Sequence, residues 1–113
     1  MNVNFIEKDK LLIFEITEEI DHHTTEKIRR RADYEIQRYM PEKVIFDFNR
    51  VIFMDSAGIG LIIGRYKTAV IVNAKVYMIN VKPKVKKVFE MSGLLGIVPI
   101  INYEDVENFA SGL

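Results

Sequence analysis

The sequence contains no cysteine and has no excess of charge of either sign. Without cysteine the chain can form no disulfide bond and has no thiolate chemistry, which fits a protein of the reducing cytoplasm. Sixteen basic and sixteen acidic side chains give a formal net charge of +0 at pH 7. The chain therefore has no overall field that would attract nucleic acid or an anionic membrane, and we expect neither as a partner.

Long hydrophobic runs are also missing. The longest apolar stretches, such as residues 57–63, are far shorter than the ~20 residues that span a bilayer. The first ten residues, MNVNFIEKDK, lack the basic start and the apolar centre of a secretory signal. The sequence therefore predicts a cytoplasmic protein.

The composition is that of a globular domain, with 49% hydrophobic and 28% charged residues. A chain of 113 residues can bury a core without help from disulfides or metals. No linker, repeat or low-complexity segment interrupts it. We therefore expect a single domain over residues 1–113.

The first third of the chain predicts a β-hairpin followed by a helix. Strands are expected at residues 3–6 and 10–17, joined by a charged turn at residues 7–9. The helix, capped by Asp21 or Thr24, should run to about residue 39, because Pro41 follows. Its apolar face is formed by residues at spacings of four, four and three: Ile28, Ala32, Ile36 and Tyr39.

Two strand–helix units and a C-terminal segment complete the pattern. The strands are expected at residues 43–48 and 75–80, and the helix between them from Ser56 or Ala57 to residue 73. The remaining predictions are a helix from Pro83 to Ser92-Gly93, an edge strand at residues 97–101 that contains Pro99, and a last helix capped by Asn102 with Glu104 and Asp105 in its first turn.

This order predicts an α/β fold. We expect a mixed, mostly parallel sheet of four to five strands with an antiparallel N-terminal hairpin, flanked by about four helices. In such sheets the functional crevice lies beyond the carboxyl ends of the strands. Ser56 follows a strand and opens a helix, so it lies where this architecture places functional sites.

The segment MDSAGIGLIIGRYK, residues 54–67, allows several interpretations of Ser56. A nucleophile is poorly supported, because Met54 replaces the first glycine of the G-x-S-x-G elbow. The two histidines, which would have to supply a base, lie together in another loop. A phosphate-binding loop is also poorly supported, because the spacing of Gly58, Gly60 and Gly64 differs from that of the dinucleotide fingerprint. Close helix–strand packing explains Gly60 and Gly64 better.

The residues by themselves favour a helix cap at Asp55-Ser56, a feature that contributes about 1 kcal/mol. A helix N-terminus would also accommodate a phosphate attached to the serine. Adjacent histidines, His22 and His23, cannot both face one ion without a turn between them. We therefore predict no metal site, no cofactor and no catalytic residue.

The whole chain resembles the STAS-domain anti-sigma factor antagonists, most closely the sporulation type that acts on the anti-sigma F factor. The resemblance is carried by four blocks in the family's order: Glu19-Ile20-Asp21-His22-His23-Thr24, Phe53-Met54-Asp55-Ser56-Ala57-Gly58-Ile59-Gly60, Gly64-Arg65-Tyr66-Lys67 and Met91-Ser92-Gly93-Leu94. The chain departs from the family at Glu18 and at Asn73-Ala74, where relatives often carry glycine. Asparagine can adopt the left-handed conformation that the second turn requires.

The resemblance implies a phosphorylation-controlled binding protein that is not an enzyme. Ser56 would be phosphorylated by an anti-sigma factor that is an ATP-dependent serine kinase. The unphosphorylated protein, a monomer when free, would bind this kinase in its ADP state and so release the sigma factor. A PP2C-type serine phosphatase would restore the active form. The contact surface would comprise Asp21, Asp55, Ser56, Ala57, Gly58, Ile59, Gly60 and Arg65.

Two alternatives remain open at this point. The chain could be a STAS module of a general-stress or sensory partner-switching complex, which would differ in its partner but not in its fold. It could also be a small serine hydrolase that uses Ser56, a function that the missing glycine at residue 54 argues against.

Overall fold

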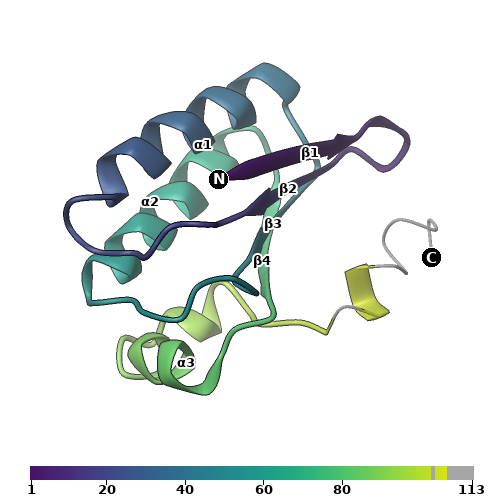
Figure 1. The fold of residues 1–113 in the computed structure, drawn as a ribbon. Helices are drawn as coiled ribbons and strands as arrows, with labels where there is room; N and C mark the ends of the chain where they lie inside the picture. Colours follow the sequence, from purple (N-terminus) through teal and green to yellow (C-terminus); the bar gives the residue numbers. More distant parts are fainter. Residues whose placement is uncertain (103, 107–113) are drawn as a thin grey trace.

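The computed structural model describes residues 1–102 and 104–106, in which a four-stranded mixed sheet forms the centre (Figure 1). The strand order is β1-β2-β3-β4, and only the β1–β2 pair is antiparallel. The prediction of a mostly parallel sheet with an antiparallel N-terminal hairpin is confirmed. The strands are β1 (Asn2–Ile6), β2 (Leu11–Glu15), β3 (Lys43–Asp47) and β4 (Lys75–Ile79).

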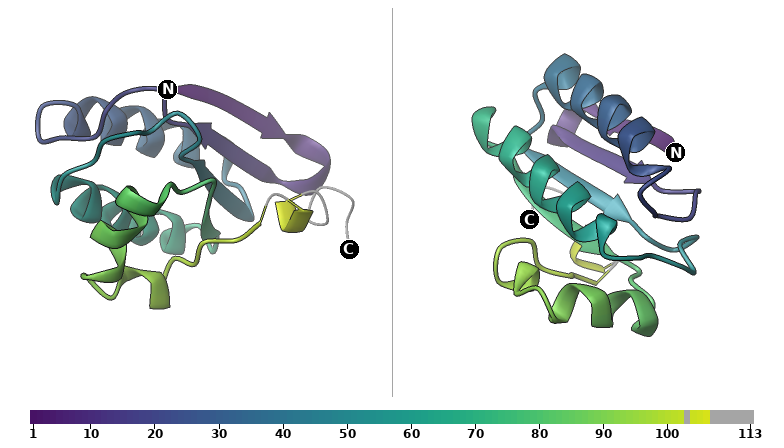
Figure 2. Two further views of the ribbon diagram at one scale, coloured as in Figure 1. Left: turned by 60° about the horizontal axis from the view of Figure 1, so that its bottom comes forward. Right: turned by 90° about the vertical axis from the view of Figure 1, so that its left-hand side faces the viewer.

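Three helices accompany the sheet: α1 (Thr25–Tyr39), α2 (Ala57–Ile71) and α3 (Pro83–Glu90). Helices α1 and α2 each connect two parallel strands, and they lie side by side on one face of the sheet (Figure 2). Helix α3 lies beyond the β4 edge (Figure 1). Two short 3-10 turns, η1 (Glu7–Asp9) and η2 (Leu94–Gly96), and one helical turn at residues 104–106 complete the described elements.

The alternation of side chains along the strands divides the core into two parts. The larger part lies between the sheet and the helices, where the rings of Phe14 and Phe46 stack and Phe89 of α3 packs edge-on against Phe48. The predicted apolar face of α1 is buried here at Ile28, Ala32 and Ile36. A smaller cluster covers the opposite face of the sheet and is formed by Leu11, Ile45, Ile79 and Val106.

Residues in the left-handed conformation set several boundaries. Lys10 has a φ of 51° and closes the turn after β1, so β2 begins at Leu11 rather than at residue 10. Asn73 has a φ of 61° after the end of α2, which confirms the conformation expected of it in the turn before β4. Strands β2, β3 and β4 each end before the predicted last residue.

The edge strand predicted at residues 97–101 is wrong. In its place a single parallel bridge joins Met78 to Ile100, with Met78 N–H donating to Pro99 O at 3.0 Å and Ile101 N–H donating to Met78 O at 2.8 Å. Turn η2, which the sequence pattern did not indicate, takes up the preceding residues, and Pro99 has no N–H to extend a ladder. Of the predicted last helix, one turn at residues 104–106 follows Asn102, and the rest lies outside the described residues.

Candidate functional site

Two loops meet at the carboxyl ends of β2 and β3, and backbone hydrogen bonds hold them together. Ile20 N–H donates to Phe53 O at 3.2 Å, and Asp55 N–H donates to Ile20 O at 3.0 Å. These bonds form an isolated parallel bridge between Ile20 and Met54. Because Asp21 and Asp55 follow the bridged residues, Asp21 and Ser56 share one rim, as the predicted topology requires.

Asp21 organises the turn that leads into α1. Its Oδ1 accepts the N–H groups of His23 at 2.8 Å and of Thr24 at 3.0 Å. Desolvation works to raise the pKa of this carboxyl, but the two N–H donors and the neighbouring His23 and His22 lower it on balance. Asp21 is therefore an anion at neutral pH. Of the two predicted caps, Asp21 holds the turn, whereas the side chain of Thr24 makes no capping bond to α1.

Asp55, rather than Ser56, caps α2. Asp55 Oδ1 accepts the N–H of Ala57 at 2.8 Å. The Ser56 hydroxyl makes no capping bond, because its backbone is already helical (φ −63°, ψ −16°) and a capping side chain needs an extended backbone. The prediction that the Ser56 hydroxyl contributes to the cap is therefore wrong. The residue is exposed, and the fold does not use its hydroxyl as a cap.

This division of roles predicts different effects on stability at two adjacent positions. Ser56→Ala should change the free energy of unfolding by no more than about 0.5 kcal/mol, as is usual for an exposed side chain. Asp55→Ala should lower it by about 1 kcal/mol, because the N–H of Ala57 loses its acceptor. Urea unfolding of both variants measures the difference. Equal losses would contradict the assignment of the cap.

Gly58 allows the first turn of α2 to lie directly on Met54. A Cβ atom added to Gly58 would lie 2.2 Å from Sδ and 2.5 Å from Cγ of Met54. Met54 is 5% exposed and provides the backbone that bridges to Ile20. The contact between Gly58 and Met54 therefore fixes the position of the Ser56 loop relative to the loop that contains Ile20. In the sequence, the apolar Met54 at a position where hydrolases have glycine argues against a nucleophile but does not by itself reveal this contact.

Gly58→Ala should lower the free energy of unfolding by about 1–3 kcal/mol, the usual cost of overpacking a buried contact. The displaced side chain of Met54 should also loosen the bridge to Ile20, which amide hydrogen exchange at Asp55 would detect. Gly60→Ala is the matched control on the same helix, because an added Cβ there meets no atom within 4 Å. If both variants unfold alike, the Met54 contact does not determine the loop.

Gly60 and Gly64 do not pack against a strand, and that prediction is wrong. No atom lies within 4 Å of a Cβ added at either position. With Ala57 they instead form one wall of a surface cavity of about 360 Å³ between α1 and α2. The other lining residues come from both helices: Thr25, Glu26, Arg29, Leu61 and Arg65.

Arg65, which the resemblance places on the contact surface, is 5% exposed. Its Nε lies 2.7 Å from Oδ1 of Asp33, so that an ion pair joins α2 to α1. Burial lowers the pKa of Arg65, and the Asp33 carboxylate works in the opposite direction. The side chain of Arg65 therefore supports the packing of the two helices and forms part of the buried lining of the cavity. Ala57 and Gly60, which also line the cavity, are more exposed than Arg65.

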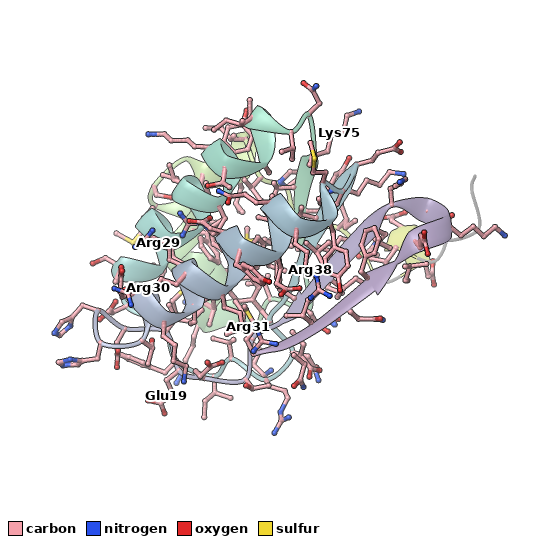
Figure 3. The ribbon with its side chains drawn as sticks, turned by 90° about the horizontal axis from the view of Figure 1, so that it is seen from above. Glu19, Arg29, Arg30, Arg31, Arg38 and Lys75 are labelled. Atoms are coloured by element: carbon pink, nitrogen blue, oxygen red, sulfur yellow. The ribbon has the colours of Figure 1, made fainter. Side chains whose placement is uncertain are left out.

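The arginines of α1 serve different sides of the helix (Figure 3). Arg29 lines the cavity on the side of α2, whereas Arg31 donates to the carbonyl of Met1 near β1. Hydrogen bonds from Arg29 and Arg30 to the carboxylate of Glu26 lower the pKa of Glu26 to about 2. Glu26 is thus charged at neutral pH, and it neutralises part of the basic surface beside the cavity.

The chemistry available at this rim is that of an exposed hydroxyl at a helix N-terminus. In the described part of the chain no histidine is hydrogen-bonded to Ser56, and His22 and His23 lie against each other with ring centroids 3.8 Å apart. Among residues 1–102 and 104–106 no cluster of three or more possible metal ligands occurs. No helix in these residues is long and apolar enough to cross a bilayer. An anion on Ser56 would lie at the N-terminus of α2, where the helix dipole favours negative charge.

Comparison with known proteins agrees with this arrangement. A match to the STAS domain extends over residues 2–107, nearly the whole chain. The chain belongs to the STAS domain family. This STAS domain is 37% identical over 94 residues to an anti-sigma F factor antagonist of Paenibacillus polymyxa. The aligned region covers 83% of this chain and 80% of the relative. The resemblance found in the sequence is thereby confirmed.

Solved structures extend the comparison to the whole fold. The STAS domain is similar to the anti-sigma factor antagonist SpoIIAA in its unphosphorylated form, with a TM-score of 0.82, 28% identity, and coverage of 99% of this chain and 96% of the other. It is also similar to the phosphorylated form of the Bacillus cell fate determinant SpoIIAA, with a TM-score of 0.71, 28% identity, and coverage of 95% and 96%. The predicted STAS fold is confirmed.

Proposed function

We propose that this STAS domain is an anti-sigma factor antagonist whose binding is switched off by phosphorylation of Ser56. The unphosphorylated form binds an anti-sigma factor in its ADP state and releases the sigma factor. The same anti-sigma factor, acting as a serine kinase with ATP, phosphorylates Ser56. A PP2C-type serine phosphatase reverses the modification. The chain itself contributes a binding surface and a phosphoacceptor, with no catalytic step of its own.

The observation that carries the proposal is the exposed Ser56, whose hydroxyl makes no capping bond. Asp55 caps α2 by accepting the N–H of Ala57, so modification of Ser56 breaks no capping bond. The N-terminus of α2 accommodates the phosphate, because the dipole of the helix favours an anion there. The names of the relatives, anti-sigma F factor antagonist and SpoIIAA, support the choice of partner.

The switch works through charge. A phosphate adds about −1.5 to −2 charges to a rim that already carries the carboxylates of Asp21 and Asp55. A partner that covers this rim must remove water from the added charge and tolerate repulsion among three anionic groups. The carboxylate of Asp21 is fixed by two N–H donors and cannot readily turn away. Phosphorylation therefore weakens binding without unfolding the domain.

Reconstitution tests this function. The protein is mixed with candidate anti-sigma kinases from its own organism, of both the sporulation and the general-stress type, in the presence of the cognate sigma factor. With ADP we expect a stable complex and free sigma factor on size-exclusion chromatography. With ATP we expect phosphate on Ser56 and loss of that complex. If no candidate forms a complex with ADP, or if the sigma factor stays bound, the proposal fails.

A further inference from the structure

Two large apolar side chains are exposed in the loop that carries Ser56. Ile52 is 67% exposed and Phe53 is 50% exposed, whereas their neighbours Val51 and Met54 are buried. Phe53 comes three residues before Ser56 in the chain. The loop therefore turns one pair of apolar side chains into the core and presents the other pair to solvent.

The backbone that presents Ile52 and Phe53 is held on both sides by hydrogen bonds. Before the pair, Val51 N–H donates to Phe48 O at 2.9 Å. At the pair itself, Ile20 N–H donates to Phe53 O at 3.2 Å. The bond to Ile20 uses only the backbone of Phe53, so it holds the loop without using the ring. A partner would meet both side chains already in place, which lowers the entropic cost of binding them.

The fold does not require apolar side chains at these two positions. In the described part of the chain neither Ile52 nor Phe53 belongs to the two core clusters or packs against them. Exposure alone assigns no role, because Val70 and Ile71 at the other end of α2 are exposed as well. What distinguishes Ile52 and Phe53 is their place beside Ser56. Apolar and aromatic side chains at the centre of a covered surface are typical anchors of protein interfaces.

The charges of the two loops indicate what kind of surface covers this pair. The charged residues at positions 16–24 and 48–56 are Glu18, Glu19, Asp21, Asp55 and Arg50. This excess of carboxylates repels an anionic lipid surface, and two side chains bury too little apolar area to hold a protein on a membrane. A protein surface that is apolar where it meets Ile52 and Phe53, and not acidic around them, fits both features.

We infer that Ile52 and Phe53 insert into an apolar hollow of the anti-sigma factor. This inference rests on the proposed function and adds to it a contact whose affinity does not depend on the charge at Ser56. The same loop then carries both the apolar anchor and the phosphoacceptor. A phosphate on Ser56 opposes the close approach that the anchor requires.

Replacement by serine tests the anchor. Phe53→Ser and Ile52→Ser remove the apolar groups and keep the backbone bond to Ile20. Both variants should melt like the wild type and bind the ADP-loaded anti-sigma factor at least about tenfold more weakly, as for loss of a central anchor. Phe53→Leu, which stays apolar, should recover most of the affinity. Ile71→Ser is the matched control, because Ile71 is 82% exposed and ends α2 roughly 20 Å from Ser56. It should bind like the wild type.

Fluorescence tests the contact independently of any change in stability. The chain contains no tryptophan, so Phe53→Trp introduces a single reporter. After subtraction of the signal of the wild-type complex, its emission should shift to shorter wavelength when the ADP-loaded anti-sigma factor binds, because the indole leaves water. Ile71→Trp should keep the emission of an exposed indole in the same complex.

Three results would overturn the inference and leave the proposed function intact: wild-type affinity in both serine variants, an equal loss in Ile71→Ser, or an unshifted emission of Phe53→Trp in the complex. Other occupants would also overturn it. A dimer of the protein alone that Phe53→Ser dissociates would assign the pair to a second copy of the chain, and binding to phosphatidylserine vesicles that Phe53→Ser abolishes would assign it to a lipid surface. If the wild type binds no candidate anti-sigma factor, the proposed function fails and the inference fails with it.

Discussion

Replacing Ser56 by aspartate is expected to weaken the complex with an ADP-loaded anti-sigma factor by about 2 kcal/mol or more, roughly thirtyfold in dissociation constant. The carboxylate adds a charge next to Asp55 and Asp21, and the partner must remove its water. The fold should be unaffected, because the side chain at residue 56 is exposed and makes no capping bond. Ser56→Ala should bind like the wild type and resist phosphorylation, because it adds no charge and removes the acceptor hydroxyl.

Ser56→Asn separates charge from size in this experiment. Asparagine has nearly the shape of aspartate and caps helices about as well, but it is neutral. Isothermal titration of the three variants should therefore rank alanine and asparagine near the wild type and aspartate far below. If asparagine weakens the complex as much as aspartate does, the effect is steric. If aspartate binds as tightly as serine, a switch that works through charge at this rim is excluded.

The largest loss of stability is expected for Asp33→Ala, at about 3 kcal/mol or more, because breaking a buried ion pair leaves a charge without a partner. Arg65 is 5% exposed and has Asp33 Oδ1 at 2.7 Å from its Nε. Urea unfolding measures the change in free energy. Asp33→Asn, which keeps the size and one acceptor oxygen, should lose less.

The double variant Asp33→Ala, Arg65→Met is the control for this explanation. Removing both charges leaves no uncompensated ion, so the double variant should be more stable than Asp33→Ala alone. This non-additivity identifies the stranded charge of Arg65 as the cause. An Asp33→Ala variant within 1 kcal/mol of the wild type, as is usual for surface pairs, would show that the pair contributes little to the packing of α1 on α2.

The sequence predicted the order of the elements because their periodic patterns are local. The apolar face of α1 and the alternating strands appear in single windows of residues, and the strand–helix order then places Ser56 at the carboxyl end of β3. The prediction at residues 97–101 failed because pairing at a sheet edge depends on the preceding turn, η2, which has no local pattern of its own.

The details of the site depended on contacts that spacing does not reveal. Asp55 and Ser56 are both good caps, and only the helical backbone at Ser56 decides between them. Three glycines follow within one helix, and which of them packs closely depends on the position of Met54. The resemblance placed Arg65 on the contact surface, whereas its burial depends on a pairing with Asp33 of another helix, which spacing does not reveal.

The most direct test of the account is to compare the two phosphorylation states of one preparation. The protein is incubated with the anti-sigma kinase and ATP, the phosphorylated and unphosphorylated forms are separated, the site is mapped by mass spectrometry, and each form is titrated with the ADP-loaded kinase. We predict a single phosphate on Ser56 and a dissociation constant at least about thirtyfold higher for the phosphorylated form. A phosphate on another residue, or equal affinity of the two forms, would contradict the account.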